Sequence, residues 1–476
     1  MGKKISSIFL SAILLLSVSG CNVAEYQQVQ SAPSLSAITP DVQLFESSDD
    51  NEPVEREAPL NYEDYVFGAF REKIVGLGDR DWMDLTTQQM LDDWDYFYQA
   101  LVDNYPYFGV VERTAGMDMN SCYQQVRNAI PNFTYDSEYL LAVYDFIQQT
   151  GNAGHLSLSW PQANDSETQL YKDIKPLMNQ ATAEYRELAG EDLKESNLTT
   201  EILKNGKIAY AKIRSFGWDT MTEDQAILFD FYRQIKDYDH LIFDITGNGG
   251  GSMGYYMDLI MAPLLRDTAI SFTYVFLKDG QLNQNHLLNR GDTIENWYKL
   301  SDAPSTFMDE FLEQTQQYFD ADTLQRVTVM FNSFVWPPEA MNTDDFKELD
   351  RYQLSTMIFE PGRTVEDEQV ESIPFQGKIW VLVDGDVYSS SESFAVTYKQ
   401  TGFATIVGTQ TGGDGIGMDP IIFTLPHSEL KIRYAPVYGT TIDGRGSEEF
   451  GTTPDIISPT GETPLETCLN AIENAK

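Results

Sequence analysis

Strands and helices alternate through the second half of this sequence, and that alternation constrains the fold more than any other feature. Ile208–Ile213 and Leu241–Ile245 are apolar runs of strand length, and Glu223–Ile235 between them has the spacing of a helix. Lys378–Asp384 is another buried strand, which a turn and a helix over residues 389–400 follow. Strands and helices in this order predict a mixed α/β layer architecture.

Apolar residues with helical spacing dominate before this region. Between Met90 and Val102 they recur at i, i+3 and i+4, and similar spacing returns up to residue 149. We therefore expect a helical N-terminal subdomain over residues 86–150, followed by an α/β domain over residues 151–460. Residues 280–370 form a polar and aromatic insertion that the pattern leaves unassigned, apart from a helix expected around Thr306–Phe319.

The first 21 residues have the layout of an export signal. Two lysines precede an apolar run over Ile8–Val18, and Val18–Cys21 resembles the bacterial lipobox, in which the cysteine is lipidated. The run is shorter than the roughly 20 residues that span a bilayer. Residues 22–80, rich in Ser, Gln, Pro and acidic residues, are typical of a flexible tether. We expect a protein of the bacterial cell envelope anchored through Cys21; an ordinary signal peptide containing a cysteine is the alternative.

The chain is strongly acidic. Its 476 residues include 73 Asp and Glu against 32 Lys and Arg, a formal charge of −41. Nucleic acids and anionic membranes attract basic surfaces, so nucleic acid is excluded as a partner and the lipid anchor is the expected membrane contact. With 42% hydrophobic residues, the chain can still bury a large core.

A glycine-rich loop follows the strand Leu241–Ile245. Gly249, Gly251 and Gly254 have the G-x-G-x-x-G spacing of a dinucleotide-binding turn, a weak signal on its own. The same run, which includes Gly250, suits a backbone whose amides approach a developing oxyanion, because glycine tolerates close approach and positive φ. A tight turn without chemistry is the third interpretation.

Ser389 lies at a junction of strand, turn and helix. Together with Glu392 it forms the pattern of a capping box, a purely structural motif. A serine hydroxyl at the start of a helix also lies where backbone N–H groups and the helix dipole stabilise negative charge. Ser389 is therefore also a candidate nucleophile, which would require a base.

Of the four histidines, His155 is the strongest candidate base. It lies where the helical region meets an alternating strand, whereas His240 precedes a buried strand, His286 lies in a polar loop and His427 lies in an expected exposed turn. A carboxylate in the polar stretch over residues 443–456 could orient such a histidine. A lone histidine is more often structural, and that alternative stays open.

Six short motifs occur in the order of one known family. They are Ala153–Leu158, Ala209–Phe216, Asp244–Gly251, Tyr388–Glu392, Ile406–Gly413 and Gly451–Ile456. Together they resemble the tail-specific, or C-terminal processing, serine peptidases, a family that includes the tricorn core. The resemblance covers roughly residues 86–460 and implies a crotonase-like α/β core.

The resemblance also implies site residues. Ser389 would be the nucleophile, His155 the base and Glu448 the orienting acid, with Glu449 as the adjacent alternative. The backbone amides near the cleaved carbonyl would form the oxyanion site. These amides belong to Gly250, Gly251 and Ser390.

Two departures from the family narrow the mechanism. In the branch with a Ser–Lys dyad the lysine lies 25 residues after the serine, and Asp414 stands there in this chain. A carboxylate cannot replace an amine as the base, so the tricorn-like branch with histidine and glutamate fits better. The span from Trp160 to Lys207 is also too short for the peptide-binding PDZ domain that many relatives carry.

We therefore predict a serine peptidase for peptides or unfolded proteins, working without a cofactor or metal. A catalytically inactive binding protein on the same scaffold is the alternative, since Thr246 stands where many relatives carry arginine. A crotonase-type acyl-CoA enzyme is a second alternative, which the export signal disfavours because CoA thioesters are cytoplasmic. The oligomeric state stays open.

Two further sets of side chains are interpreted as structural. Asp92, Asp93 and Asp95 are expected on the solvated face of a helix rather than in a metal site. Cys122 and Cys468 are far apart in sequence, and the sequence does not predict a disulfide between them.

Overall fold

The computed structural model describes residues 81–159, 196–300, 343–364, 368–442 and 444–474, with four isolated positions between 176 and 184. The predicted export signal with Cys21, the tether and the helix expected around Thr306–Phe319 lie outside the described residues.

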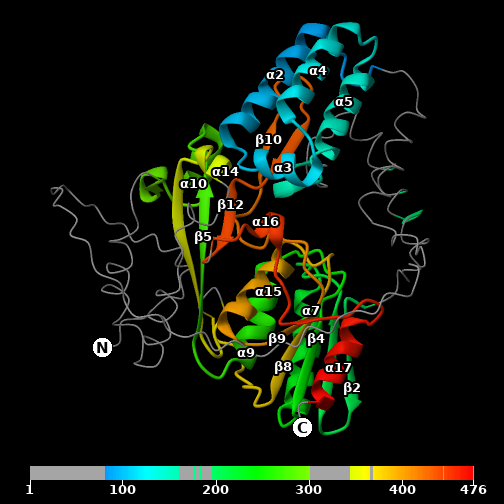
Figure 1. Ribbon diagram of the computed structural model, residues 1–476, viewed down its shortest axis with the longest axis vertical. Coiled ribbons are helices and arrows are strands. Elements are labelled where there is room, and N and C mark those ends of the chain that lie inside the picture. The colour runs from blue at the N-terminus through cyan, green and yellow to red at the C-terminus, as the bar shows by residue number, and fades with distance from the viewer. Residues whose placement is uncertain are drawn as a thin grey trace, which may run out of the picture.

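A six-stranded sheet forms one end of the molecule (Figure 1). Its order is β13 (Ile456–Ile457), β9 (Thr405–Gly408), β8 (Lys378–Val383), β4 (His240–Asp244), β3 (Ile208–Ile213) and β2 (Leu198–Lys204). All neighbours are parallel except β2 and β3. Parallel central strands need cover on both faces, which explains why β4 and β8 are continuous apolar runs. The predicted mixed α/β fold is confirmed.

Helices supply that cover. On one face lie α7 (Met221–Ile235), α8 (Met253–Tyr256), η3 (Met257–Met261), α9 (Ala262–Leu264) and α15 (Ser390–Thr401). On the other face α17 (Pro464–Asn474) packs Cys468 and Ile472 against Trp380. Cys468 and Cys122 are both free thiols. The helix α15 begins at the edge of the sheet where the carboxyl ends of β4 and β8 lie.

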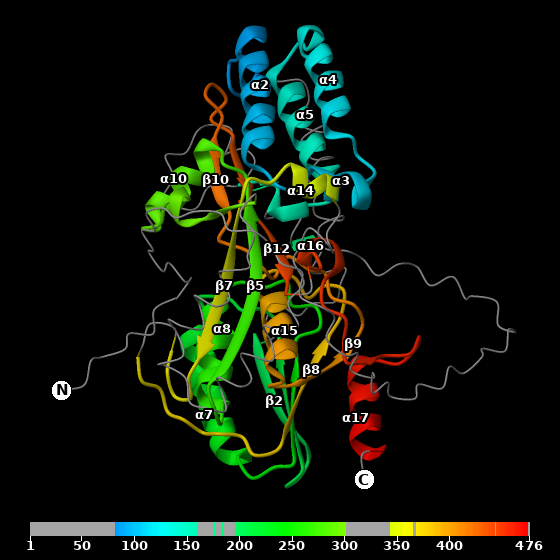
Figure 2. The same cartoon turned by 60° about the vertical axis from the view of Figure 1, so that its left-hand side comes forward.

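A second, antiparallel sheet connects this end to the rest of the molecule (Figure 2). Its order is β12 (Val437–Thr441), β5 (Ala269–Leu277), β7 (Arg351–Phe359) and β6 (Tyr298–Lys299). The region that the sequence left unassigned contributes β6 and β7, and also α10 (Gln281–Asn289), η4 (Ile294–Asn296) and α14 (Thr343–Lys347). β5 and β7 pair along nine residues each and run from the six-stranded sheet towards the helical end of the molecule.

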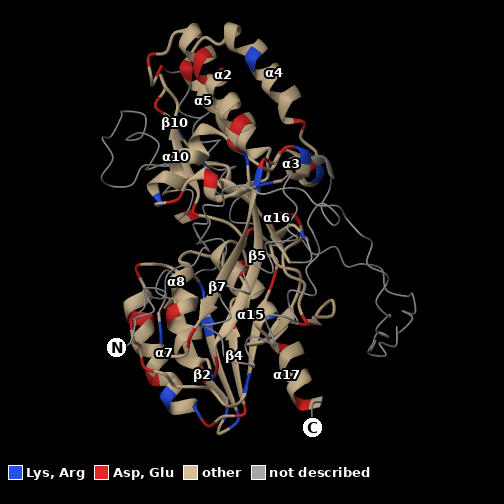
Figure 3. Cartoon of the chain, turned by 90° about the vertical axis from the view of Figure 1, so that its left-hand side faces the viewer, with Lys and Arg blue, Asp and Glu red and all other residues tan. Residues whose placement is uncertain are grey.

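Helices occupy the described chain up to residue 148. They are α2 (Thr87–Asn104), α3 (Phe108–Ala115), α4 (Met119–Ala129), η1 (Ile130–Asn132) and α5 (Asp136–Gln148). Among the described helices, none combines the length and the apolar composition that crossing a bilayer requires. In Figure 3, red segments mark Asp and Glu residues on helices at both ends of the molecule.

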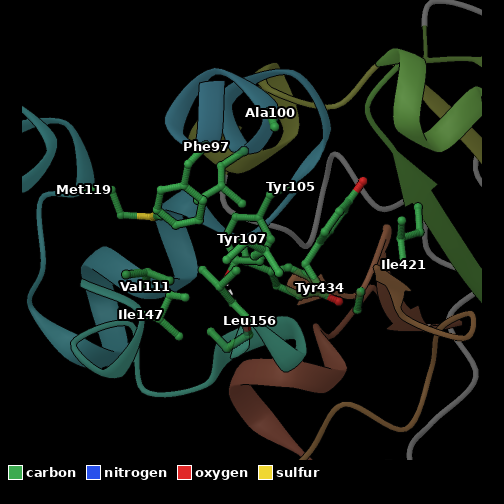
Figure 4. Close-up of a cluster of buried hydrophobic side chains, with 14 of the residues drawn as sticks. Phe97, Ala100, Tyr105, Tyr107, Val111, Met119, Ile147, Leu156, Ile421 and Tyr434 are labelled. Carbon is green, nitrogen blue, oxygen red and sulfur yellow. Dashed lines mark hydrogen bonds between the residues drawn. The ribbon is translucent and has the colours of Figure 1, made fainter. Parts of the chain in front are cut away.

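The helices pack on a small third sheet made of β1 (Ser157–Leu158), β11 (Lys431–Tyr434) and β10 (Ile421–Thr424). Side chains of α2 and α3 share one buried cluster with this sheet (Figure 4). Phe97, Val111 and Tyr434 belong to it and are fully buried. Because Leu156 lies in the same cluster, the helical end fixes the segment around His155.

Asp93 corrects one expectation about the acidic residues of α2. It is fully buried rather than solvated, and its carboxylate accepts the backbone N–H groups of His427 (2.8 Å) and Ser428 (2.7 Å). The turn between β10 and β11 packs on this helix face, so a carboxylate there supplies the acceptors that the turn lacks. Asp95 forms an ion pair with Arg127 (2.7 Å).

Replacing Asp93 with Ala should therefore destabilise the fold. Two buried N–H donors would lose their acceptor, which predicts a loss of about 2–4 kcal/mol in the free energy of unfolding. The neighbouring Asp92 is half exposed; it accepts the side-chain amide of Gln88 (2.8 Å) and lies 3.8 Å from His427. Asp92→Ala is thus the matched control, with an expected loss below about 1 kcal/mol. Equal losses in chemical denaturation of the two variants would contradict this account.

Candidate active site

His155, Ser389 and Asp414 come together from segments that are far apart in the sequence. His155 ends the short helix η2 (Ala153–His155), Ser389 directly precedes α15, and Asp414 lies between β9 and β10. The Nε2 atom of His155 lies 3.1 Å from Ser389 Oγ. On its other side, Nδ1 is in close polar contact with Asp414 Oδ2. The imidazole thus lies between a hydroxyl and a carboxylate, both within hydrogen-bond reach.

Backbone strain is concentrated in these three residues. Their φ angles are +57° at His155, +57° at Ser389 and +52° at Asp414. The described residues contain six non-glycine positions with positive φ, and three of them meet at one imidazole. Such conformations cost on the order of 1–3 kcal/mol each and gather at functional sites. The strain therefore supports a function for this cluster.

Aromatic residues of the helical end hold the turn that carries His155. The Tyr105 hydroxyl donates to the carbonyl of Ala153 (2.6 Å). A Cβ on Gly154 would lie 2.3 Å from the Tyr107 ring, and Gly154 has φ +55°, so only glycine fits there. Figure 4 shows Tyr105 and Tyr107 inside the buried cluster. Packing of the helical end thus sets the position of the imidazole.

The hydroxyl of Ser389 faces His155 instead of capping the helix. Ser389 is the N-cap of α15, but its side chain makes no capping hydrogen bond. Glu392, the other half of the expected capping box, is fully buried and its Oε1 accepts the Thr452 hydroxyl (2.6 Å). The structural interpretation of this motif is therefore wrong, and the N-terminus of a 12-residue helix lies behind Ser389.

The glycine loop packs against the turn of Ser389. A Cβ on Gly250 would lie 3.0 Å from both Ser389 Cβ and Ser390 N, and one on Gly251 would lie 2.3 Å from Phe216 O. Gly250 N donates to the Asn248 side chain (2.9 Å). Among the described residues, the N–H groups of Gly251 and Ser390 have no hydrogen-bond acceptor. Of the three amides expected from the sequence, these two are available to an oxyanion.

Two residues that connect the glycine loop to Ser389 had no predicted role. Asn248 is fully buried; its side chain donates to Ile213 O (3.2 Å) and its carbonyl accepts from Tyr388 N (3.3 Å). The Tyr388 ring stacks on His155 with centroids 5.2 Å apart. Their positions, just before Gly249 and just before Ser389, are the signal that could have identified them.

Asp414, not Glu448, contacts Nδ1 of His155. Glu448 was expected to orient His155. Its Oε1 instead accepts the backbone N–H of Gly154 (3.0 Å). The Tyr388 hydroxyl reaches both carboxyl groups, at 3.3 Å from Asp414 Oδ2 and 3.5 Å from Glu448 Oε2. The physical reason is that the tight loop after β9 brings Asp414 directly against the imidazole, with Glu448 beside it.

The alternative acid, Glu449, faces away from His155. It pairs with Arg113 of α3 (2.8 Å), which also pairs with Asp345 of α14. These contacts connect the helix α16 (Ser447–Phe450), which carries Glu448, to the helical end.

Burial changes the protonation of the carboxyl groups around Asp414. It raises the pKa of Glu448 well above its usual range, and the neighbouring Asp414 raises it further. Burial also raises the pKa of Glu392 to about 8, with a smaller contribution from Asp414. Both shifts favour the protonated forms of the two carboxyl groups beside Asp414.

The other three histidines lie outside this cluster. His240 Nδ1 accepts the indole N–H of Trp380 (3.3 Å), His286 lies on α10 and His427 lies in the turn between β10 and β11. His155 is thus the histidine that the structure brings to Ser389.

Comparison with known proteins gives the following matches. A model of peptidase family S41 matches residues 207–458. Among solved structures, a candidate peptidase from Parabacteroides merdae is 17% identical, with a TM-score of 0.46 and coverage of 80% of this chain and 96% of that chain. Mature CPAF complexed with lactacystin is 12% identical, with a TM-score of 0.48 and coverage of 82% and 97%. A lipoprotein from Streptococcus agalactiae is 13% identical, with a TM-score of 0.37 and coverage of 88% and 99%.

The raised pKa of Glu392 predicts how stability changes with pH. Its pKa is 4.5 when unperturbed and about 8 in the folded chain, so the folded state retains a proton that the unfolded state loses. The free energy of unfolding should therefore fall as pH rises from about 4.5 to about 8, by up to about 1.4 kcal/mol per pH unit.

Glu392→Gln should remove this part of the decline, measured by chemical denaturation from pH 5 to 9. The exposed Glu223→Gln controls for the change in net charge and should follow the unmodified chain. A constant difference between Glu392→Gln and the unmodified chain at every pH would contradict the assignment.

Proposed function

Since this chain belongs to peptidase family S41 and is a serine peptidase, we propose that Ser389 is its nucleophile, His155 its general base and Asp414 the carboxylate that orients His155. The observation that carries this proposal is the 3.1 Å distance from His155 Nε2 to Ser389 Oγ, with Asp414 at Nδ1. The same arrangement of nucleophile, base and orienting carboxylate recurs on unrelated folds.

The proposed reaction follows from these contacts. Ser389 Oγ attacks the carbonyl carbon of a peptide bond while His155 Nε2 takes the hydroxyl proton. The N–H groups of Gly251 and Ser390 bind the oxygen that becomes negative, and the dipole of α15 favours that charge. His155 then gives its proton to the leaving amine. Water hydrolyses the acyl-enzyme by the same route, which restores the serine.

Asp414 and Glu448 divide the role that the sequence assigned to Glu448 alone. Asp414 accepts from Nδ1–H, which selects the tautomer with a free Nε2 and stabilises the imidazolium. Burial beside Asp414 raises the pKa of Glu448 and so favours its protonated form. A neutral Glu448 supports the turn at Gly154 without competing with Asp414 for the positive charge on His155.

We further propose peptides or unfolded proteins as substrates, with C-terminal processing as the finer assignment. Lipidation at Cys21 would hold the enzyme at the bacterial cell envelope, as the lipobox resemblance at Val18–Cys21 suggests. The inactive binding protein is the competing function. The approach of Ser389 to His155 favours the enzyme, because a binding protein does not need that contact.

A fluorophosphonate probe tests the nucleophile. It should label the unmodified chain at Ser389 and fail to label Ser389→Ala, since the probe reacts with an activated serine hydroxyl. The neighbouring Ser390→Ala retains Ser389 and serves as the control, with labelling preserved. Persistent labelling of Ser389→Ala would disprove the assignment, and absence of labelling in every variant would favour the binding protein.

Conservative variants separate the two carboxyl groups. Asp414→Asn should lower kcat by about 10³–10⁴-fold, because an amide holds the wrong imidazole tautomer and cannot stabilise the imidazolium. Glu448→Gln, which replaces a neutral acid with a neutral amide, should remain within about tenfold of the unmodified enzyme. If Glu448→Gln loses as much kcat as Asp414→Asn, then Glu448 is the orienting carboxylate and the assignment to Asp414 is wrong.

A further inference from the structure

Arg433 lies beside the proposed catalytic residues, on the strand next to the one that follows His155. On β11 it pairs directly with Ser157 of β1, two residues after His155, and with Ile422 of β10. Opposed residues in an antiparallel pair share a face of the sheet, with Cβ atoms roughly 4.5–5.5 Å apart. Arg433, Ser157 and Ile422 therefore share one face.

This face is turned away from the buried core. The adjacent residues Ile432 and Tyr434 are fully buried in the cluster under the helices, so Arg433 points to the opposite side. Ile422 is 53% exposed on the side of Arg433. The guanidinium interacts electrostatically with Tyr388 and Asp414, which places it on the side of the imidazole.

Arg433 has no ion-pair partner among the described residues, although the chain has 73 acidic side chains. Arg266 and Arg445 donate to carbonyl or hydroxyl oxygens instead, and six other arginines of the described chain are paired with carboxylates. They are Arg113, Arg127, Arg233, Arg290, Arg351 and Arg363. Arg433 is nevertheless half-buried, and this burial lowers its pKa. A desolvated guanidinium gains most from a bidentate carboxylate, which the described protein does not supply.

The chemistry of the reaction identifies which part of a substrate reaches Arg433. The leaving amine must lie against His155 Nε2 to receive its proton, and that amine begins the C-terminal fragment of the substrate. Chain beyond the amine extends by at most about 3.6 Å per residue, so its first few residues can reach the segment that follows His155. Ser157 belongs to that segment, and Arg433 lies opposite it on β11.

We propose that Arg433 binds a carboxylate of the substrate on the C-terminal side of the cleaved bond. The carboxylate belongs either to the free C-terminus of a substrate cut near its end or to an acidic side chain in the same position. This inference rests on the proposed function, because it uses His155 to locate the leaving amine.

The experiment compares three peptides that differ only beyond the cleaved bond. One ends in a free carboxylate a few residues after the bond, one ends there in an amide, and one is amidated but carries an Asp in the same segment. Each is cleaved by the unmodified enzyme, by Arg433→Gln and by Lys431→Gln. Lys431 lies two residues away on the same strand and the same face, so its variant is the matched control.

The unmodified enzyme and Lys431→Gln should show kcat/KM about 10–100-fold higher for a carboxylate peptide than for the neutral amide, the range expected of a charged hydrogen bond. Arg433→Gln should lose this preference, so that its kcat/KM for the carboxylate peptides falls to its own value for the amide peptide. Preference for the free terminus alone identifies the α-carboxylate, and preference for the Asp peptide alone identifies a side chain. An acid-to-amide ratio that Arg433→Gln leaves unchanged would overturn the proposal.

An equal loss of kcat/KM on all three peptides in Arg433→Gln would also overturn the proposal, since Arg433 would then act only through Asp414. Failure of the proposed function gives a different result, because no enzyme variant would then cleave any peptide.

Discussion

The contact of one imidazole with Ser389 and Asp414 is the interaction on which the rest of the site depends. It joins chain segments more than 200 residues apart, and each segment is held by a different part of the fold. The parallel sheet and α15 place Ser389, while the helical end places His155 through Tyr105 and Tyr107. A loss of packing in the helical end would therefore displace His155 through the turn at Gly154.

The same contact accounts for the different pKa shifts of the buried carboxyl groups around His155. Several carboxylates in a small apolar volume repel each other, so burial favours protons on all but the one with a cationic partner. In the proposed reaction His155 becomes such a partner when it takes the serine proton, and it contacts Asp414. Glu448 and Glu392, which lack that contact, have raised pKa values.

Much of this architecture was predictable because it depends on residues that are close together in the sequence. The strands β4 and β8 are apolar runs, and the glycines and serine after them mark the two turns that meet. The antiparallel strands β5 and β7 were missed because their pairing depends on distant partners. The contact of Asp414 with Nδ1 was not predicted for a similar reason: Asp414 and Glu448 both lie near His155, and the path of the loop after β9 brings Asp414 to that atom.

The tautomer of His155 tests the central claim most directly. Nitrogen NMR of histidine-labelled protein reports which ring nitrogen carries the proton, and with four histidines in the chain a His155→Gln variant assigns the signal. If Asp414 accepts from Nδ1 and Ser389 donates to Nε2, the neutral ring carries its proton on Nδ1, and Glu448→Gln leaves this unchanged. A proton on Nε2 in the unmodified chain would contradict the account.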